Sequence, residues 1–438
     1  MLFRQFVDDD LGCASYLIGD EAAGEAVVVD PAYAIEPYLE EAEHSGVRIV
    51  RVLETHTHAD HVSGHGRLAL EHGVPVSIHP LGEPEYPFEP VEDGQELGVG
   101  SVAIRVLHTP GHRPEHCCYL VDGRLLTGDS LLVGDAARPD LAVDVREGAE
   151  GLYESLQRLA GLPPETAVYP GHVAGSLCAT GISADRSSTI SAELMTNRAL
   201  AFPSEEEFVA AHATISAPRP PTVERVVALN RGHFLGAPSP LEELDSYDGQ
   251  VLDVRSPLEF AAGHVHGALN IPVAGSSLGT KAGFLLAAER PVAIHAASRE
   301  DTETAATRLR AVGLLELAGY LLHPKADERL EPIGIDELEA LLADGGAELI
   351  DVREKNERDE GYIPESRHIP YRLVGEFADE LQNGRTVVTI CESGARAGVA
   401  ASVLAAHGVP ARPLLEGGIP DLQKRGHALT SFRRCGSG

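Results

Sequence analysis

Residues 55–64 read Thr55-His-Thr-His-Ala-Asp-His-Val-Ser-Gly64, directly after an apolar run at 48–53 that predicts a buried strand. The segment offers the candidate metal ligands His56, His58, Asp60 and His61. In an extended segment alternate side chains point the same way, so we expect His56, His58 and Asp60 to converge on one point. Histidine and carboxylate groups clustered in this way are typical of a metal site.

The remaining candidate ligands each follow a predicted strand. They are His112 after the strand at 102–107, Asp129 after the strand that begins at Leu125, and His172 after the strand at 167–170. Because loops that follow neighbouring strands can gather at one edge of a sheet, we expect these residues to join the 55–64 segment around one metal centre.

The composition describes a globular protein of two or three domains. The chain has 438 residues, of which 43% are hydrophobic, and this length exceeds that of one ordinary core. There is no apolar run of membrane-spanning length and no signal-peptide layout at the start, so we expect a cytoplasmic location. The six cysteines are scattered, which favours a reducing compartment.

The charge argues against two classes of partner. The chain has 67 Asp and Glu residues against 35 Lys and Arg, which gives a formal net charge of −32. Such a field repels nucleic acid and anionic membranes, so we expect neither as a partner. Anionic substrates would need arginines in their own site. The sequence leaves open whether the chain forms a homo-oligomer.

The C-terminal half contains an internal repeat. Val251-Leu-Asp-Val-Arg255 recurs as Leu349-Ile-Asp-Val-Arg353, after a Pro-rich linker at 236–240. Apolar strands alternate with amphipathic helices in both copies, which predicts two α/β modules with parallel sheets. The expected domains are 1–235, 236–330 and 331–438.

The second copy carries a thiol loop, Cys391-Glu-Ser-Gly-Ala-Arg396, between a predicted strand at 385–390 and a helix from Ala397. Backbone N–H groups at a helix start, together with the Arg396 guanidinium, favour a thiolate, a persulfide or sulfonate oxygens there. Glu392 opposes this charge, so we expect its side chain to point to solvent. The predicted catalytic loop is Cys391, Glu392, Ser393, Gly394, Ala395 and Arg396.

The first copy has lost this chemistry. Alignment of the copies sets Ala296 against Cys391, Arg299 against Gly394, and Asp301 against Arg396. The cysteine nucleophile is therefore absent, and the arginine expected to bind an anion is replaced by an aspartate of opposite charge. We expect this copy to be a docking or dimerisation module, or a spacer between two active sites.

The first domain resembles the metallo-β-lactamase superfamily, and within it the persulfide dioxygenase branch, with the glyoxalase II hydrolases nearby. The motifs that carry the resemblance are Thr55–Gly64, Thr109-Pro-Gly-His112 and Thr127–Leu141. It implies an αββα sandwich and one Fe(II) per chain, held by His56, His112 and Asp129. His58, Asp60, His61 and His172 would then orient the ligands or the substrate, or hold a second metal.

The residues themselves leave the number and kind of metal open, because a two-zinc hydrolase would use the same donors. Arg138 matches an arginine that contacts substrate carboxylates in the resembled branch; an ordinary surface arginine is the alternative. Glutathione-using relatives carry Asp-Tyr after the last histidine, whereas Val173 follows His172 here, so the carrier thiol stays unidentified. Cys178 is either a sulfur way-station or a packing residue.

The last module resembles a rhodanese, a sulfurtransferase. The matching pieces are Ile350–Glu354, Gly361-Tyr-Ile-Pro364, the loop from Cys391 and Glu416-Gly-Gly418. Related dual-specificity phosphatases use one residue more in the loop, so its length favours sulfane sulfur over phosphate.

These features predict a bifunctional enzyme of sulfide or thiosulfate handling. The iron centre would oxidise a low-molecular-weight thiol persulfide with O2 to sulfite and thiol, and Cys391 would transfer sulfane sulfur between persulfide and thiosulfate or sulfite. Fusion raises the local concentration of the shared intermediate. The alternatives are a two-zinc glyoxalase II-like thioester hydrolase with accessory rhodanese modules, and a non-enzymatic sulfur relay.

Overall fold

The computed structural model describes residues 1–139, 144–173, 183–213 and 218–432. The chain divides into two compact units, Met1–Ser239 with Thr307–Leu315, and Pro240–Ala306 with Glu316–Gly438. Cys178, for which the sequence left two roles open, lies outside the described residues.

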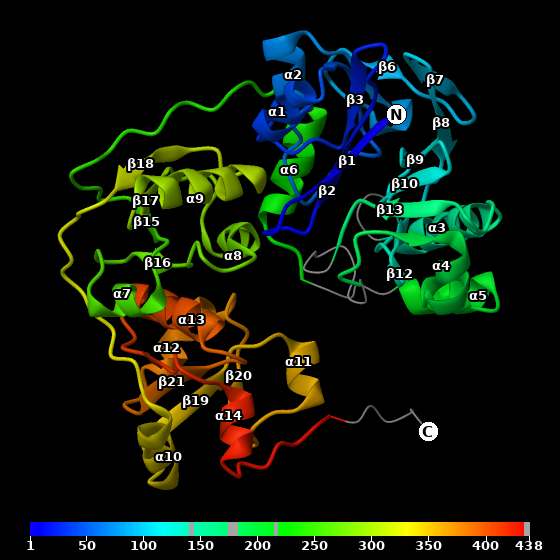
Figure 1. Ribbon diagram of the computed structural model, residues 1–438. Coiled ribbons are helices and arrows are strands. Elements are labelled where there is room, and N and C mark those ends of the chain that lie inside the picture. Colours follow the sequence, from blue (N-terminus) through cyan, green and yellow to red (C-terminus); the bar gives the residue numbers. More distant parts are fainter. Residues whose placement is uncertain (140–143, 174–182, 214–217, 433–438) are drawn as a thin grey trace. The chain divides into compact units, whose positions relative to one another are not determined.

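The first unit is built on two six-stranded sheets (Figure 1). One sheet has the order β1-β2-β3-β4-β5-β6, with the bounds Leu2–Val7, Ala14–Asp20, Glu25–Val29, Arg48–Leu53, Val76–Ile78 and Glu89–Pro90. The other has the order β14-β13-β10-β9-β8-β7, with the bounds Ser188–Thr189, Ala167–Pro170, Arg124–Gly128, Cys117–Val121, Val102–His108 and Glu96–Val99. A small hairpin joins β11 (Leu131–Leu132) to β12 (Asp135–Ala136).

The main core of this unit lies between the two sheets. Along β2, Tyr16 and Ile18 face inward and pack with Ile104 and Tyr119 of the other sheet. Leu17 lies between them in sequence and packs on the opposite face of its sheet. This alternation is the two-residue period of a β-strand, and here both faces are apolar because both are covered.

Helices cover the outer face of each sheet. On the first sheet, α1 (Glu36–His44) and α2 (His65–His72) bury Tyr38 and Leu68 in a second core. On the second sheet, α3 (Val145–Ala160) and α5 (Glu205–His212) bury Leu152 and Phe208 in a third. The unit also contains η1 (Pro80–Gly82), α4 (Ile190–Thr196), η2 (Ala199–Ala201) and α6 (Thr222–Arg231). The predicted αββα sandwich is confirmed.

The second unit contains two parallel sheets with the same connectivity. The first module comprises β15 (Gln250–Asp253), α7 (Pro257–Ala262), β16 (Leu269–Asn270), α8 (Leu278–Leu285), β17 (Val292–His295), α9 (Arg299–Ala311) and β18 (Leu317–Leu321). The second comprises α10 (Ile335–Ala343), β19 (Ala347–Asp351), α11 (Lys355–Glu360), β20 (Arg367–His368), η3 (Val374–Phe377), α12 (Ala378–Leu381), β21 (Thr386–Ile390), α13 (Ala395–Ala406), β22 (Arg412–Pro413) and α14 (Ile419–Lys424).

The strand orders are β16-β15-β17-β18 and β20-β19-β21-β22, and every pair is parallel. Corresponding strands therefore occupy corresponding places, which confirms the predicted repeat of an α/β module. Within the described ranges, none of the helices combines the length and the hydrophobicity that crossing a bilayer requires.

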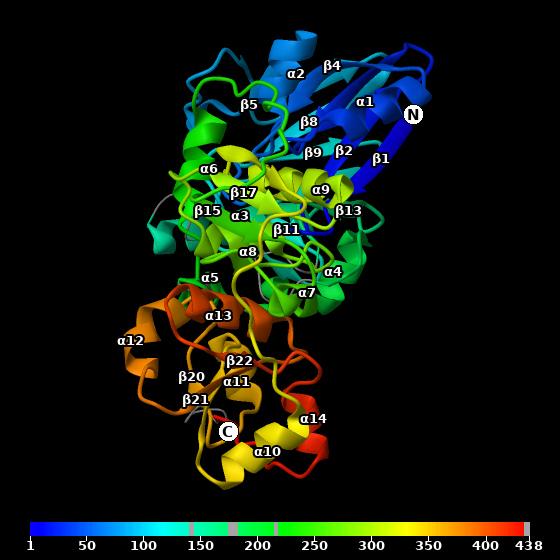
Figure 2. The same ribbon diagram turned by 90° about the vertical axis from the view of Figure 1, so that its left-hand side faces the viewer.

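The two modules contact each other through α13, the helix that follows the thiol loop. In both views α13 lies beside α7 (Figures 1 and 2). The Asn270 amide N–H donates to Ser402 Oγ at 2.9 Å, and the Asn270 side chain donates to the carbonyl oxygens of Asp253 and Arg255. Ser402 is completely buried, and its hydroxyl donates a hydrogen bond to Val399 O. The first module thus contacts the helix that follows the thiol loop of the second.

We expect Ser402→Ala to lower the free energy of unfolding by about 1–3 kcal/mol, because it leaves the buried Asn270 N–H without its acceptor. Urea unfolding followed by circular dichroism measures the change. The exposed Ser276 provides the control, since Ser276→Ala should change the free energy by less than about 0.5 kcal/mol. Equal effects of the two substitutions would contradict the supporting role of this contact.

Candidate functional site

His56, His112 and Asp129 form a buried group of possible metal ligands. One donor atom from each lies within 4.8 Å of the other two, and each residue is about 1% exposed. They come from the loops after β4 and β8 and from the end of β10, so the expected gathering at one sheet edge is observed. The distance from His112 Nε2 to Asp129 Oδ2 is 3.5 Å.

Hydrogen bonds turn the lone pairs of both histidines toward the same space. Thr55 Oγ1 donates to Asp30 Oδ2 at 2.8 Å, so it accepts from His56 Nδ1 at 2.9 Å. His112 Nδ1 donates to the Arg138 carbonyl at 2.8 Å. In each ring, Nε2 is therefore the atom left to bind a cation.

The unpartnered donor atoms of this group fit a divalent cation. His56 Nε2 and Asp129 Oδ2 are buried and have no hydrogen-bond partner among the residues that the structure describes. Burial lowers the pKa of His56 and of His112, so both imidazoles are neutral and can act as ligands. Two imidazoles and one carboxylate at one point form a recognised metal-binding set.

His58 does not belong to this group. Its Nε2 lies 3.1 Å from Asp30 Oδ1 and 3.3 Å from Glu54 Oε2, both of which are buried. Burial acts to lower the pKa of His58, but the two carboxylates outweigh it and raise the pKa well above its ordinary value. A histidine held as an imidazolium is a poor metal ligand.

The convergence of His56, His58 and Asp60 on one point stays a prediction: the His56 and His58 rings lie 4.2 Å apart and His58 Nδ1 lies 3.9 Å from Asp60 Oδ1, but each residue joins different donors. The described donors separate into three groups, one around each of these residues. Asn230 of α6 holds the backbone of this segment: its Nδ2 donates to His58 O at 3.0 Å and to His61 O at 2.8 Å. Its Oδ1 accepts from the Ser63 amide at 2.9 Å.

His172 connects two of the groups. Its Nδ1 lies 2.7 Å from Asp129 Oδ1 and its Nε2 lies 2.8 Å from Asp60 Oδ2. Burial acts to raise the pKa of Asp129, but His172 outweighs it and the pKa is lowered. This histidine therefore orients the Asp129 carboxylate, with Oδ1 occupied and Oδ2 directed to the first group.

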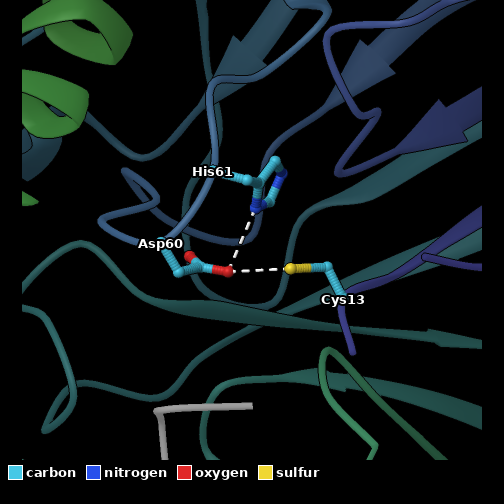
Figure 3. Close-up of side chains that lie close together, drawn as sticks. All are labelled: Cys13, Asp60 and His61. Atoms are coloured by element: carbon cyan, nitrogen blue, oxygen red, sulfur yellow. Dashed lines mark hydrogen bonds and ion pairs between the residues drawn. The ribbon is translucent and has the colours of Figure 1, made fainter. Parts of the chain in front are cut away.

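Sequence reasoning missed four residues of the site. They are Cys13, Asp30, His116 and Asn230. His116 Nε2 accepts from the Asp129 amide at 3.0 Å, and burial lowers the pKa of His116 to about 3. The Cys13 thiol donates to Asp60 Oδ2 at 2.9 Å (Figure 3). Only His116, four positions after His112, had a signal in its spacing.

Arg138 is largely buried, at 8% exposure, beside the metal-ligand group. Its backbone carbonyl accepts the hydrogen bond from His112, so the chain at this position helps to orient a candidate ligand. Contact of its side chain with a substrate carboxylate stays a prediction.

The thiol loop of the second module closes tightly around its cysteine. Cys391 is 1% exposed, and the Gly394 amide donates to its Sγ at 3.1 Å. Gly394 has φ of 92°, and a Cβ there would lie 2.1 Å from Leu415 O, so the loop requires glycine. Helix α13 begins at Ala395, two positions earlier than expected and directly after the Gly394 amide that bonds the sulfur.

Arg396 is not open to an anion in this conformation, because Glu357 of α11 pairs with it. The guanidinium donates to both Glu357 oxygens, with Nη2 to Oε1 at 2.6 Å. Burial acts to lower the pKa of Arg396, but Glu357 outweighs it and the pKa is raised. The Glu392 side chain is 52% exposed, as expected, and its Oε2 lies 3.6 Å from Arg353 Nη1.

The corresponding loop of the first module is closed by local contacts. Ala296 is completely buried where the second module has its cysteine. Ser298 Oγ donates to Asp301 Oδ2 at 2.8 Å and accepts from the Asp301 amide at 3.1 Å. A serine cap thus occupies the start of α9, and this loop has neither a thiol nor a cation at its centre.

Comparison with known families agrees with the division of the chain into a sandwich domain and two α/β modules. Residues 8–172 match the metallo-beta-lactamase superfamily, and residues 239–322 and 334–425 match the rhodanese-like domain. A solved metallo-beta-lactamase from Staphylococcus aureus is similar at 29% identity with a TM-score of 0.68, over 73% of this chain and 98% of its own.

Two curated relatives differ in their activities. The mitochondrial persulfide dioxygenase ETHE1 of Bos taurus is 30% identical over 238 residues, which cover 52% of this chain and 87% of that protein. The hydroxyacylglutathione hydrolase of Methylobacillus flagellatus is 37% identical over 152 residues, which cover 34% of this chain. The match spans only 58% of that hydrolase.

We expect Asn230→Ala to lower the free energy of unfolding by about 2–4 kcal/mol, because it removes the partners of three backbone groups in the metal-binding loop. It should also weaken metal binding, measured by competition with a chromophoric chelator. The exposed Asn383 is the matched control, and Asn383→Ala should leave metal affinity unchanged. Unchanged affinity in Asn230→Ala would contradict the role of this residue in shaping the loop.

Proposed function

This chain belongs to the metallo-beta-lactamase superfamily, with two rhodanese-like domains after its first domain, and we propose that it is a persulfide dioxygenase joined to a sulfurtransferase. The first activity oxidises the persulfide of a small thiol to sulfite. The second moves sulfane sulfur through Cys391.

The observation that carries the proposal is the gathering of His56, His112 and Asp129 around one buried space. His58 is held by Asp30 and Glu54, and the remaining donors form their own group. Two imidazoles and one carboxylate that leave several coordination positions open are the ligand set of non-haem Fe(II) oxygenases. The similarity to a persulfide dioxygenase supports the same choice.

The residues of the chain hold and orient the reactants. His56, His112 and Asp129 would hold one Fe(II), while Thr55, the Arg138 carbonyl and His172 keep these ligands directed inward. When bound, ferrous iron supplies the redox chemistry by which O2 reacts with sulfane sulfur. We assign the Arg138 side chain to an anionic group of the substrate. The net reaction is RSSH + O2 + H2O → RSH + SO3²⁻ + 2H⁺, in which O2 takes four electrons from one sulfur.

The geometry of the thiol loop supports the rhodanese step. The Cys391 thiolate attacks the outer sulfur of thiosulfate, the S–S bond breaks and sulfite leaves, so the cysteine becomes a persulfide. The Gly394 N–H and the start of α13 stabilise the negative sulfur. A small thiolate then takes the outer sulfur and becomes the persulfide that the iron centre consumes. The reverse direction, from sulfite and persulfide to thiosulfate, uses the same groups.

A second candidate is a two-zinc thioester hydrolase of the glyoxalase II type. The similarity to a hydroxyacylglutathione hydrolase favours it, as does the presence of His58, Asp60, His61 and His172. It would require His58 to bind a metal through Nδ1 as a neutral ring, whereas Asp30 and Glu54 at its Nε2 raise the pKa of His58, which makes it the less favoured candidate.

We expect anaerobically purified protein loaded with Fe(II) to consume O2 when a small-thiol persulfide is added, with about one iron per chain. An oxygen electrode and metal analysis on one sample measure both quantities. Absence of O2 uptake, together with two bound zinc ions and thioester hydrolysis, would contradict the dioxygenase and favour the hydrolase.

We expect two substitutions to separate the activities. His112→Ala should lower O2 uptake by at least about 100-fold through loss of a metal ligand, and leave thiocyanate formation from thiosulfate and cyanide unchanged. Cys391→Ser should have the opposite effects, because only a thiolate accepts the sulfane sulfur. Loss of sulfur transfer in His112→Ala would mean that the two sites are not independent.

A further inference from the structure

Glu357 of α11 holds the arginine that ends the thiol loop. Its two carboxylate oxygens accept hydrogen bonds from both terminal nitrogens of Arg396, with Nη2 to Oε1 at 2.6 Å. Cys391, at the other end of the loop, interacts electrostatically with the same guanidinium. The Arg396 and Glu357 side chains are 22% and 33% exposed, so a solute can reach the pair. A bidentate pair of this kind occupies the N–H donors that a sulfur oxyanion would use.

The start of α11 fixes the Glu357 carboxylate in this place. Glu357 is the third residue of the helix, and its Oε2 accepts from the Glu354 amide at 3.2 Å as half of a capping box. Burial acts to raise the pKa of Glu357, but Arg396 outweighs it and the pKa is lowered. The carboxylate is therefore ionised at neutral pH and is held in position to pair with Arg396.

The first module shows that this helix cap does not require an arginine. Its Glu259 stands at the position of Glu357 and caps α7 in the same way, with Oε2 accepting from the Ser256 amide at 3.0 Å. Asp301 stands there in place of Arg396, so the cap forms without the pair. Helix capping alone thus does not explain why Glu357 binds Arg396.

Two further arginines of the second module are paired as well. Arg353 Nη2 donates to Asp351 Oδ2 at 2.8 Å, and Arg372 Nε donates to Glu354 Oε1 at 3.1 Å. Neither therefore offers an unpaired guanidinium to an anion. The surroundings of Arg396 do not replace the cation that Glu357 occupies.

The possible sulfur donors differ in how they depend on this arginine. Thiosulfate is a dianion, and sulfite leaves as a dianion when the Cys391 thiolate takes the outer sulfur, so a guanidinium at the oxyanion group favours that step. The persulfide of an uncharged thiol has no oxyanion group. Its reaction is Cys–S⁻ + RSSH → Cys–SSH + RS⁻, in which one S–S bond forms and another breaks. A carboxylate on Arg396 opposes the first donor by charge and by competition, and leaves the second unaffected.

We propose that Glu357 is a specificity-determining residue of the thiol loop, which disfavours thiosulfate and sulfite and makes exchange of sulfane sulfur between thiols the preferred reaction. A sulfur oxyanion binds Arg396 only after the Glu357 carboxylate turns away, whereas a persulfide reaches Cys391 with the pair intact. The inference rests on the proposed sulfurtransferase activity of Cys391.

Glu357→Gln in the full-length protein tests it, because glutamine retains the size and the capping oxygen of the side chain but removes its charge. Loading of Cys391 with sulfur is followed by mass spectrometry of its peptide, with thiosulfate or mercaptoethanol persulfide as the donor. We expect the half-saturating concentration of thiosulfate to fall by at least about tenfold, and that of the persulfide to change by less than about twofold. Glu357→Ala, whose side chain cannot pair with Arg396, should shift thiosulfate in the same direction.

Glu360→Gln is the matched control, since it removes the same charge from an exposed position of the same helix. It should change neither donor by more than about twofold. A half-saturating concentration of thiosulfate that is unchanged or raised in both Glu357 variants would overturn the proposal, because Glu357 would then only orient Arg396.

Binding without reaction separates this inference from the proposed activity. Thiosulfate is titrated by calorimetry into metal-free Cys391→Ser protein and into the same protein with Glu357→Gln added. We expect the double variant to bind at least about tenfold more tightly. Equal affinities would overturn the role of Glu357, whereas tighter binding with no loading of Cys391 by either donor would count against the sulfurtransferase alone.

Discussion

The buried carboxylate of Asp30 is the contact on which the first domain's chemistry depends. It accepts hydrogen bonds from the Thr55 amide and hydroxyl and pairs with His58. The hydroxyl in turn fixes the His56 ring, so one carboxylate both directs a candidate metal ligand inward and pairs with Nε2 of a second histidine, His58. A buried charge of this kind is tolerated only when it is fully paired, which makes the arrangement rigid.

The protein controls its thiols by the groups that face them. Cys391 faces a backbone N–H at a helix start, which suits a thiolate that attacks and releases sulfur. Cys13 faces a carboxylate, and burial with that charge raises the pKa of the Cys13 thiol. The first environment would suit the transfer proposed for Cys391, whereas in the second the thiol hydrogen is bonded to a carboxylate, so the two cysteines have different surroundings.

The two copies of the α/β module differ at the loop that precedes α9 in one and α13 in the other, because only the second has a cysteine there. The silent copy retains the strand order of the active copy and closes its loop with a serine cap. Its Asn270 bonds Ser402 on α13, and its Phe284 meets Tyr371 of the active module at a ring-centroid distance of 6.5 Å. Because α13 begins at the thiol loop, residues that pack against this helix influence the position of Cys391. The first module can therefore affect the thiol loop although it has no cysteine of its own.

The sequence alone determined the αββα sandwich and the repeat, because strand periodicity and recognisable motifs lie in contiguous residues. It named His56, His112 and Asp129, which the structure brings together as candidate metal ligands. It also located the thiol loop and its lost counterpart. Only the tertiary structure decided where the donors of the 55–64 segment point. In an irregular loop, side-chain direction is set by hydrogen bonds from residues distant in sequence, here Asp30 and Asn230. For the same reason neither the pairing of Arg396 with Glu357 nor the approach of Cys13 to Asp60 could be predicted from spacing.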